Sequence, residues 1–92
     1  MAIGAIWYPP VDRQAYEAIR DKVLQAGFDK GMQFHAAGEA DGQWRVFEVW
    51  DSRDGMERYV REDLGPAADE VSGGQAEIPQ PELVFDIHFQ KP

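Results

Sequence analysis

Apolar and polar residues alternate along the middle of the chain, in the stretch GMQFHAAGEADGQWRVFEVWDS that runs from residue 31 to residue 52. Alternation with a period of two is typical of a half-buried β-strand. The dipeptide Asp41-Gly42 interrupts it, and hairpin loops of two residues favour this dipeptide because both positions need a positive φ. The pattern therefore predicts two antiparallel strands joined by a tight turn. A four-residue loop is the alternative.

The turn decides which residues of the two strands face each other. With a two-residue loop, Ala40 lies opposite Gln43 and His35 lies opposite Glu48, whereas a four-residue loop keeps His35 and Glu48 on one face as diagonal neighbours. One face of the hairpin is then purely apolar and consists of Phe34, Ala36, Phe47 and Val49. The other face is mixed and consists of Gln33, His35, Ala37, Val46, Glu48 and Trp50.

The N-terminal part of the chain predicts one strand and one helix. Residues 2–8 form a short apolar run that ends at Pro9-Pro10, as expected for a buried strand. Apolar residues then recur at three- and four-residue spacing, which predicts a helix from Arg13 to about Ala26 with Asp12 as its cap and Gly27 as its stop. The apolar stripe of this helix consists of Ala15, Tyr16, Ile19, Val23 and Ala26.

The C-terminal part repeats this alternation of helix and strand. Ser52 is expected to cap a helix from Arg53 to Leu64, which Gly65-Pro66 would end. The apolar stripe of that helix consists of Met56, Tyr59, Val60 and Leu64. Residues 67–71 are compatible with one more helical turn, residues 72–74 form a connector, and residues 76–81 form an extended lead-in to the last strand.

The last strand is expected over residues 83–90. Its alternation places Leu83, Phe85, Ile87 and Phe89 on one face and Val84, Asp86, His88 and Gln90 on the other. The element order is therefore βαββαβ, which predicts an α+β, ferredoxin-like fold with a four-stranded antiparallel sheet and two helices on one face. We expect the helices to cover the purely apolar face. The mixed face, which includes Trp44 and Trp50, would then meet a second subunit.

Composition narrows the classes of function. The 92 residues form a single domain, residues 1–92, whose small core suggests that any sizeable pocket needs a second subunit. The net charge of −8 disfavours binding to nucleic acid and to anionic membranes. No apolar run reaches the roughly 20 residues of a membrane span, and the N-terminus lacks the basic start of a signal peptide, so we expect a cytoplasmic protein. The absence of cysteine excludes disulfides and thiolate chemistry.

His35 and Glu48 form the sharpest candidate for chemistry. A carboxylate opposite an imidazole orients the ring and strengthens it as a general base. The same pair could also just satisfy two polar groups at a dimer interface. The other candidate ligand-binding residues are Trp50, Gln33, Tyr8, Trp44, Asp86 and His88. Two His and two carboxylates would suit zinc or iron, but the second and fourth strands lie at opposite sheet edges in this topology, so we expect no metal.

Several short motifs together resemble a known superfamily. They are His35-Ala36-Ala37-Gly38, then Gly42, Trp44, Val46, Glu48, Val49, Trp50 and Ser52, and the helix exit Leu64-Gly65-Pro66. With the element order around them, they resemble the dimeric α+β-barrel superfamily that includes the antibiotic biosynthesis monooxygenases. The resemblance implies a ferredoxin-like subunit, a homodimer with facing sheets, and a ligand cleft between sheet and helices or inside the barrel.

The resemblance also implies a range of activities. Members include cofactor-free oxygenases acting on aromatic polyketides, haem-degrading enzymes, and isomerases or decarboxylases of small aromatics. The haem-degrading branch relies on an Asn, a Trp and a helical His, and the oxygenases often use an Asn with Trp residues. This chain departs from both patterns because it contains no Asn, and neither of its His residues lies on a predicted helix.

Three functions are compatible with these observations. In the first, a cofactor-independent enzyme, monooxygenase-like or isomerase/cyclase-like, uses His35 polarised by Glu48 to remove a proton from a small aromatic or polyketide-like substrate, and Trp50 forms a wall of the pocket. In the second, a non-catalytic homodimer binds a small apolar or aromatic ligand. In the third, the chain is a structural module whose pocket is filled by its own side chains.

Overall fold

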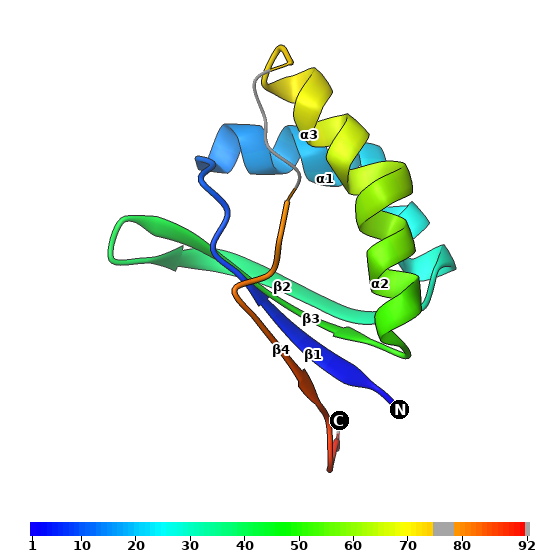
Figure 1. Ribbon diagram of the computed structural model, residues 1–92. Helices are drawn as coiled ribbons and strands as arrows, with labels where there is room; N and C mark the ends of the chain where they lie inside the picture. The colour runs from blue at the N-terminus through cyan, green and yellow to red at the C-terminus, as the bar shows by residue number, and fades with distance from the viewer. Residues whose placement is uncertain (75–78, 92) are drawn as a thin grey trace.

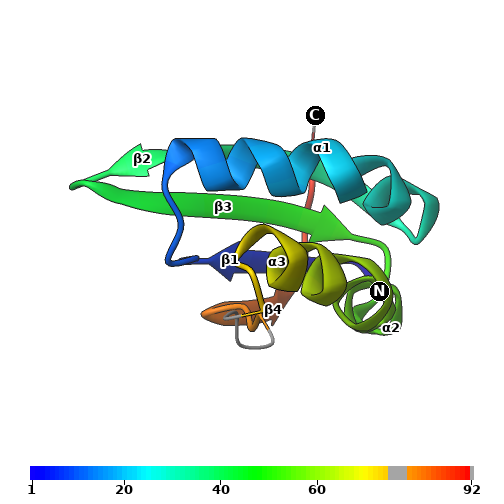
Figure 2. The same cartoon turned by 90° about the horizontal axis from the view of Figure 1, so that it is seen from above.

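The computed structural model describes residues 1–74 and 79–91 as one sheet with helices on one side (Figure 1). The elements are β1 (Ile3–Trp7), α1 (Arg13–Asp29), β2 (Met32–Ala40), β3 (Gln43–Trp50), α2 (Arg53–Tyr59), η1 (Val60–Leu64), α3 (Gly65–Val71) and β4 (Leu83–Asp86). The strands are antiparallel and lie in the order β2-β3-β1-β4. Figure 2 shows α1 along β2 and β3, and α2 and α3 on the side of β1 and β4. The predicted ferredoxin-like arrangement is confirmed.

The hairpin has the predicted turn and register. Asp41 and Gly42 have φ values of 54° and 76°, as a two-residue loop requires. His35 pairs with Glu48 across the two strands. An irregularity in β2 between Met32 and Phe34 shifts the register, so that Met32 lies opposite Trp50 in the place that strict alternation gives to Gln33. Gln33 is therefore exposed and does not take the place that strict alternation predicted.

The prediction of which sheet face the helices cover is wrong. The covered face is the mixed one, whose buried side chains include Ile3, Ala5, Trp7, Val46, Glu48 and Trp50. The purely apolar face is open, and Phe34, Phe47, Leu83 and Phe85 on it are 49%, 36%, 53% and 40% exposed. The mixed face can be buried because its polar groups find partners among themselves and on α1, as described below. It also carries the buried indole rings of Trp7 and Trp50, which contribute buried apolar area.

Helix α1 begins as predicted but ends later. The side chain of Asp12 accepts a hydrogen bond from the amide of Ala15 at 2.8 Å, so Asp12 is the N-cap. Gly27 does not stop the helix, which continues to Asp29. Gly27 is buried, and a Cβ built on it would lie 2.7 Å from the Cε atom of Met32. Gly27 therefore packs against Met32 and does not end the helix, and a methyl group there would require the end of the Met32 side chain to move.

The second helical rod also continues past its predicted end. The hydroxyl of Ser52 accepts from the amide of Gly55 at 3.1 Å, which confirms the predicted cap. The helix widens into the single π-helical turn η1, in which the Gly65 amide donates to the Val60 carbonyl, and it then continues as α3. Pro66 does not break the rod because it lies in the first turn of α3, where a missing N–H is tolerated.

The C-terminal segment is shorter in regular structure than predicted. Strand β4 ends at Asp86, so residues 87–90 do not extend it. Of the predicted lead-in over 76–81, residues 76–78 lie outside the described residues, and residues 79–81 form neither helix nor strand. The amides of Glu82 and Ile87 donate to the carbonyls of Ile6 and Ala2, which holds both ends of β4 against β1.

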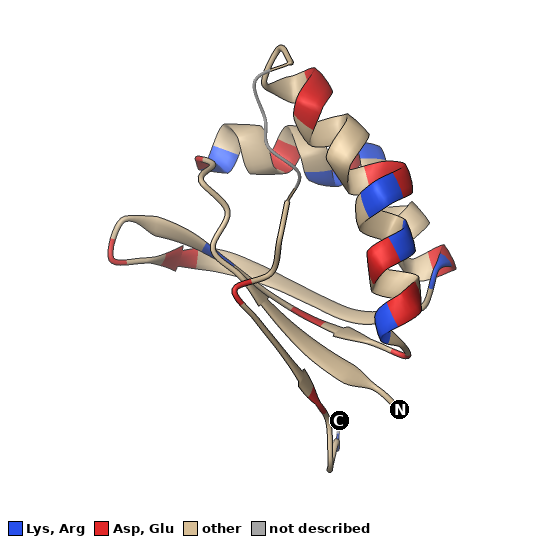
Figure 3. Ribbon diagram, viewed as in Figure 1, with Lys and Arg blue, Asp and Glu red and all other residues tan. Residues whose placement is uncertain are grey.

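Charged residues lie mainly on the helices and at the hairpin tip, and few lie on the strands (Figure 3). This separation leaves the open face of the sheet as an apolar surface in an acidic protein. Among the described residues, none of the helices has both the length and the apolar character that crossing a bilayer would demand.

Candidate functional site

A buried carboxylate lies at the centre of the covered face. Glu48 is 4% exposed. Its Oε1 atom accepts hydrogen bonds from the indole Nε1 atoms of Trp7 and Trp50, each at 3.0 Å. Its Oε2 atom lies 2.9 Å from Nδ1 of His35. These contacts offset the cost of burying a charged group and hold the carboxylate in one position.

The carboxylate orients His35. When Nδ1 carries the proton that Glu48 accepts, Nε2 presents its lone pair, and this nitrogen lies 2.5 Å from the hydroxyl of Tyr16. The His35 side chain is 14% exposed, so α1 and the sheet enclose most of the ring. The predicted pairing of His35 with Glu48 is thus present as a hydrogen bond, inside a single chain.

Tyr16 completes a series of two hydrogen bonds that we call the Tyr16–His35–Glu48 relay. Burial raises the pKa of the Tyr16 phenol, the nearby Arg20 lowers it, and the negative charges of Glu48 and Glu17 raise it further. Because the net direction is upward from the ordinary value of 10.0, the phenol keeps its proton at neutral pH and can donate it to His35.

The polar role of Tyr16 was not predicted from the sequence. Its position in the apolar stripe of α1 indicated packing only, and its hydroxyl meets His35 because α1 lies over β2. A tyrosine in an otherwise aliphatic stripe was the one available signal, because a buried phenol usually needs a hydrogen-bond partner.

Two of the predicted aromatic residues lie beside the relay. Trp50 is fully buried and bonds Glu48 directly. The ring of Trp44 packs against Tyr16, with 5.1 Å between ring centroids. The indole Nε1 of Trp44 is buried and has no acceptor among the described residues.

The other predicted ligand-binding residues lie away from the relay. Tyr8 is 50% exposed. The guanidinium carbon of Arg45 lies over the Tyr8 ring, 4.2 Å from the ring centroid. Asp86 and His88 are exposed at and beyond the end of β4, and Gln33 is exposed on β2. In the described part of the chain, no group of three or more His, Asp or Glu side chains could hold a metal ion.

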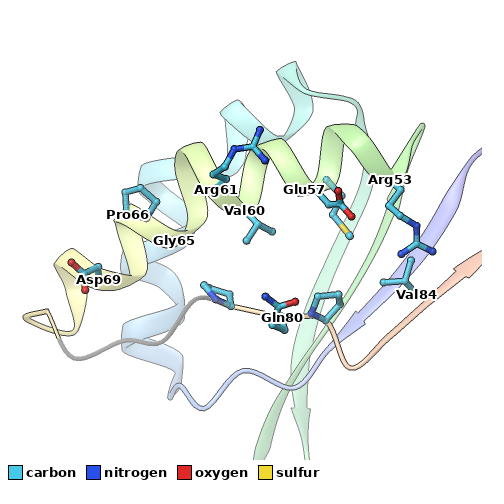
Figure 4. A pocket seen from close by; sticks show the side chains of 12 residues that line it. Arg53, Glu57, Val60, Arg61, Gly65, Pro66, Asp69, Gln80 and Val84 are labelled. Carbon is cyan, nitrogen blue, oxygen red and sulfur yellow. The ribbon is translucent and has the colours of Figure 1, made fainter.

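A groove of about 680 Å³ opens elsewhere on the same chain (Figure 4). It lies between the α2–η1–α3 rod on one side and the segment from residue 79 to residue 81 with β4 on the other. Its lining consists of Arg53, Met56, Glu57, Val60, Arg61, Gly65, Pro66, Asp69, Pro79, Gln80, Pro81 and Val84. The sequence predicted that a sizeable pocket would need a second subunit, but this groove is formed by one chain. No member of the relay lines it.

Comparison with known proteins supports the fold. No family model matches the sequence, and no curated protein matches it. Rv0793 from Mycobacterium tuberculosis aligns with 18% identity and a TM-score of 0.63, covering 99% of this chain and 97% of that one. A mutant of SnoaB, a cofactor-independent oxygenase from Streptomyces nogalater, aligns with 13% identity and a TM-score of 0.60, covering 99% and 95%.

A third solved structure is similar over almost the same length. It is a candidate antibiotic biosynthesis monooxygenase from Caulobacter crescentus, with 20% identity and a TM-score of 0.58, covering 94% of this chain and 89% of that one. The chain therefore has the fold of the antibiotic biosynthesis monooxygenase-like proteins, and at these identities the likeness concerns the fold alone.

Proposed function

We propose that this chain is a cofactor-independent enzyme, monooxygenase-like or isomerase/cyclase-like, that removes a proton from a small aromatic or polyketide-like substrate. The observation that carries the proposal is the Tyr16–His35–Glu48 relay, in which a buried carboxylate orients an imidazole toward a phenol. The fold it shares with SnoaB, a cofactor-independent oxygenase, is consistent with this chemistry.

The proton moves through the relay in one direction. Because Nε2 of His35 is occupied by the Tyr16 hydroxyl, the substrate proton passes to the Tyr16 oxygen as the phenolic proton passes to Nε2. Tyr16 is neutral before and after the step, His35 becomes an imidazolium, and Glu48 stabilises that cation across 2.9 Å. The substrate is left as a carbanion or enolate, which then rearranges or reacts with molecular oxygen.

Turnover of an aromatic ketone tests the proposal. Anthrone is a suitable probe because the C–H between its two rings is acidic and its carbanion reacts with oxygen. His35→Ala should reduce turnover by about 10²–10⁴-fold, the usual contribution of a general base. His88→Ala is the matched control, because that His is exposed and follows β4, which lies at the opposite edge of the sheet from the strand of His35, and it should retain wild-type turnover. If a substrate is found and His35→Ala turns it over normally, the mechanism is wrong.

A second function, a non-catalytic small-molecule-binding homodimer, is supported by two other observations. The groove of about 680 Å³ contains no relay residue, so a ligand can occupy it without meeting His35. The open sheet face exposes four large apolar side chains, Phe34, Phe47, Leu83 and Phe85. A second copy of this chain, placed with its sheet against that face, would cover them. A ligand that binds and leaves unchanged would distinguish this function from catalysis.

A further inference from the structure

We infer that the groove between the α2–η1–α3 rod and β4 binds a small aromatic acid, whose carboxylate pairs with Arg53. The inference concerns a site that the proposed proton-transfer chemistry does not use. It rests on the volume and apolar lining of the groove and on the lack of a partner for Arg53.

The groove has the volume and the apolar lining of a small-molecule site. Its volume of about 680 Å³ falls within the usual range of small-molecule sites, about 300–1,000 Å³. Met56 and Val60 contribute apolar surface from the rod, and Val84 contributes it from β4. Figure 4 shows Val60 pointing from the rod toward Gln80. Three prolines, Pro66, Pro79 and Pro81, add rigid apolar surface.

The π-helical turn contributes to this shape. Val60 is the first residue of η1, where the backbone widens so that its carbonyl bonds the amide of Gly65. A Cβ on Gly65 would lie 2.9 Å from that carbonyl oxygen, so the close approach depends on glycine. Single π-helical turns within α-helices frequently occur at functional sites. Here the turn coincides with the wall of the groove.

Arg53 supplies the charge that selects an acid. Figure 4 shows its guanidinium reaching from the start of α2 toward Val84. It makes no hydrogen bond or ion pair with any residue that the structure describes, in a chain of net charge −8. Arg61 also lines the groove, but its guanidinium lies 3.8 Å from Glu62. A guanidinium beside apolar walls recognises a carboxylate through two parallel hydrogen bonds.

Two carboxylates, those of Glu57 and Asp69, also line the groove. Asp69 lies on α3, on a different helix from Arg53, which is at the start of α2 (Figure 4). Glu57 is four residues after Arg53 on the same helix, the spacing of an ion pair, yet it forms none with a described residue. Its negative charge would repel a bound acid. Neutralising Glu57 should therefore strengthen binding, whereas neutralising Arg53 should weaken it.

Titration of the intact protein with 2-naphthoate, followed by amide NMR, tests the inference without measuring turnover. We expect shifts at Val60 and Val84, binding weakened about fivefold in Arg53→Gln, and binding strengthened in Glu57→Gln. Arg58→Gln is the matched control because Arg58 pairs with Glu62, 3.7 Å away, and does not line the groove. The neutral analogue 2-naphthalenemethanol should bind the wild type and Arg53→Gln equally.

Three outcomes would overturn the inference. They are no shift at the groove at millimolar naphthoate, equal weakening of both ligands by Arg53→Gln, and equal effects of Arg53→Gln and Arg58→Gln. Because each is a binding measurement, a failure here is distinguishable from a failure of the His35 chemistry, which only turnover reports.

Discussion

Replacing Glu48 by Gln should reverse the relay while leaving the fold intact. The amide oxygen can still accept from the indoles of Trp7 and Trp50, which both bond Oε1 of Glu48. The amide NH₂ group would then face Nδ1 of His35 and donate to it, where Oε2 of Glu48 now lies. His35 must therefore place its proton on Nε2, which turns that nitrogen from an acceptor for Tyr16 into a donor.

The loss of stability in each variant depends on how many buried indole donors keep a hydrogen-bond acceptor. Glu48→Gln keeps an acceptor for both indoles, so the free energy of unfolding should change by about 1 kcal/mol or less. Glu48→Ala leaves two buried indole donors without acceptors, at about 1–3 kcal/mol each. For a domain of this size, a loss of about 2 kcal/mol lowers Tm by about 8–16 °C. Turnover should fall in both variants, because each loses the carboxylate that orients His35; a change of tautomer of the kind expected for Glu48→Gln costs about 10⁴-fold in a serine-protease triad.

Three measurements separate these effects. Thermal unfolding gives Tm, turnover of anthrone gives activity, and side-chain NMR of His35 reports which ring nitrogen carries the proton, with the exposed His88 as an internal reference. We expect Glu48→Gln to have nearly the wild-type Tm, the Nε2–H tautomer and little activity. A Glu48→Gln protein that keeps the Nδ1–H tautomer, or a Glu48→Ala protein as stable as the wild type, would refute the reasoning.

The remaining predictions concern Tyr16, the packing of α1 and the open sheet face. Because the pKa of Tyr16 is raised in the folded state, its contribution to stability is complete below pH 10 and is lost as the pH rises through the raised pKa. Above pH 10, the free energy of unfolding should therefore fall less steeply with pH in Tyr16→Phe than in the wild type. The same slope in both proteins would contradict this role of Tyr16. Gly55→Ala should cost about 1–3 kcal/mol by denaturant unfolding, since its Cβ would lie 2.3 Å from the backbone carbonyl oxygen of Lys30 at the end of α1, whereas Gly38→Ala, with no atom within 4 Å, should be close to neutral. Equal effects would exclude the packing role. Phe47→Lys should convert a dimer to a monomer in light scattering, and a wild-type monomer would exclude the homodimer.

Local chemistry explains why the hairpin could be predicted from the sequence. The positive φ angles at Asp41 and Gly42 are a property of that dipeptide, and once the turn is set, the two-residue period decides that His35 faces Glu48. The caps at Asp12 and Ser52 are similarly local, because each side chain bonds an amide three residues away. The order of the elements followed from the same signals.

The covered face of the sheet could not be predicted in this way. Counting polar residues favoured the purely apolar face, because a buried Glu48 is costly unless it has partners. Those partners, Trp7 and Trp50 from two strands and His35 from a third, come together only when the sheet forms. The prediction that Gly65-Pro66 ends the second helix is wrong for a related reason. The π-helical turn before Gly65 places Pro66 in the first turn of α3, where a proline is tolerated.

The sequence by itself determined the βαββαβ order, the hairpin register and the His35–Glu48 pairing, because each depends on residues close together in the chain or across one tight turn. Tertiary structure decided the rest. Packing of α1 on the mixed face brings Tyr16 to Nε2 of His35, and packing of the α2–η1–α3 rod opposite β4 forms the groove beside Arg53. These contacts join residues far apart in sequence, so only the balance of buried area and satisfied polar groups in the folded chain selects them.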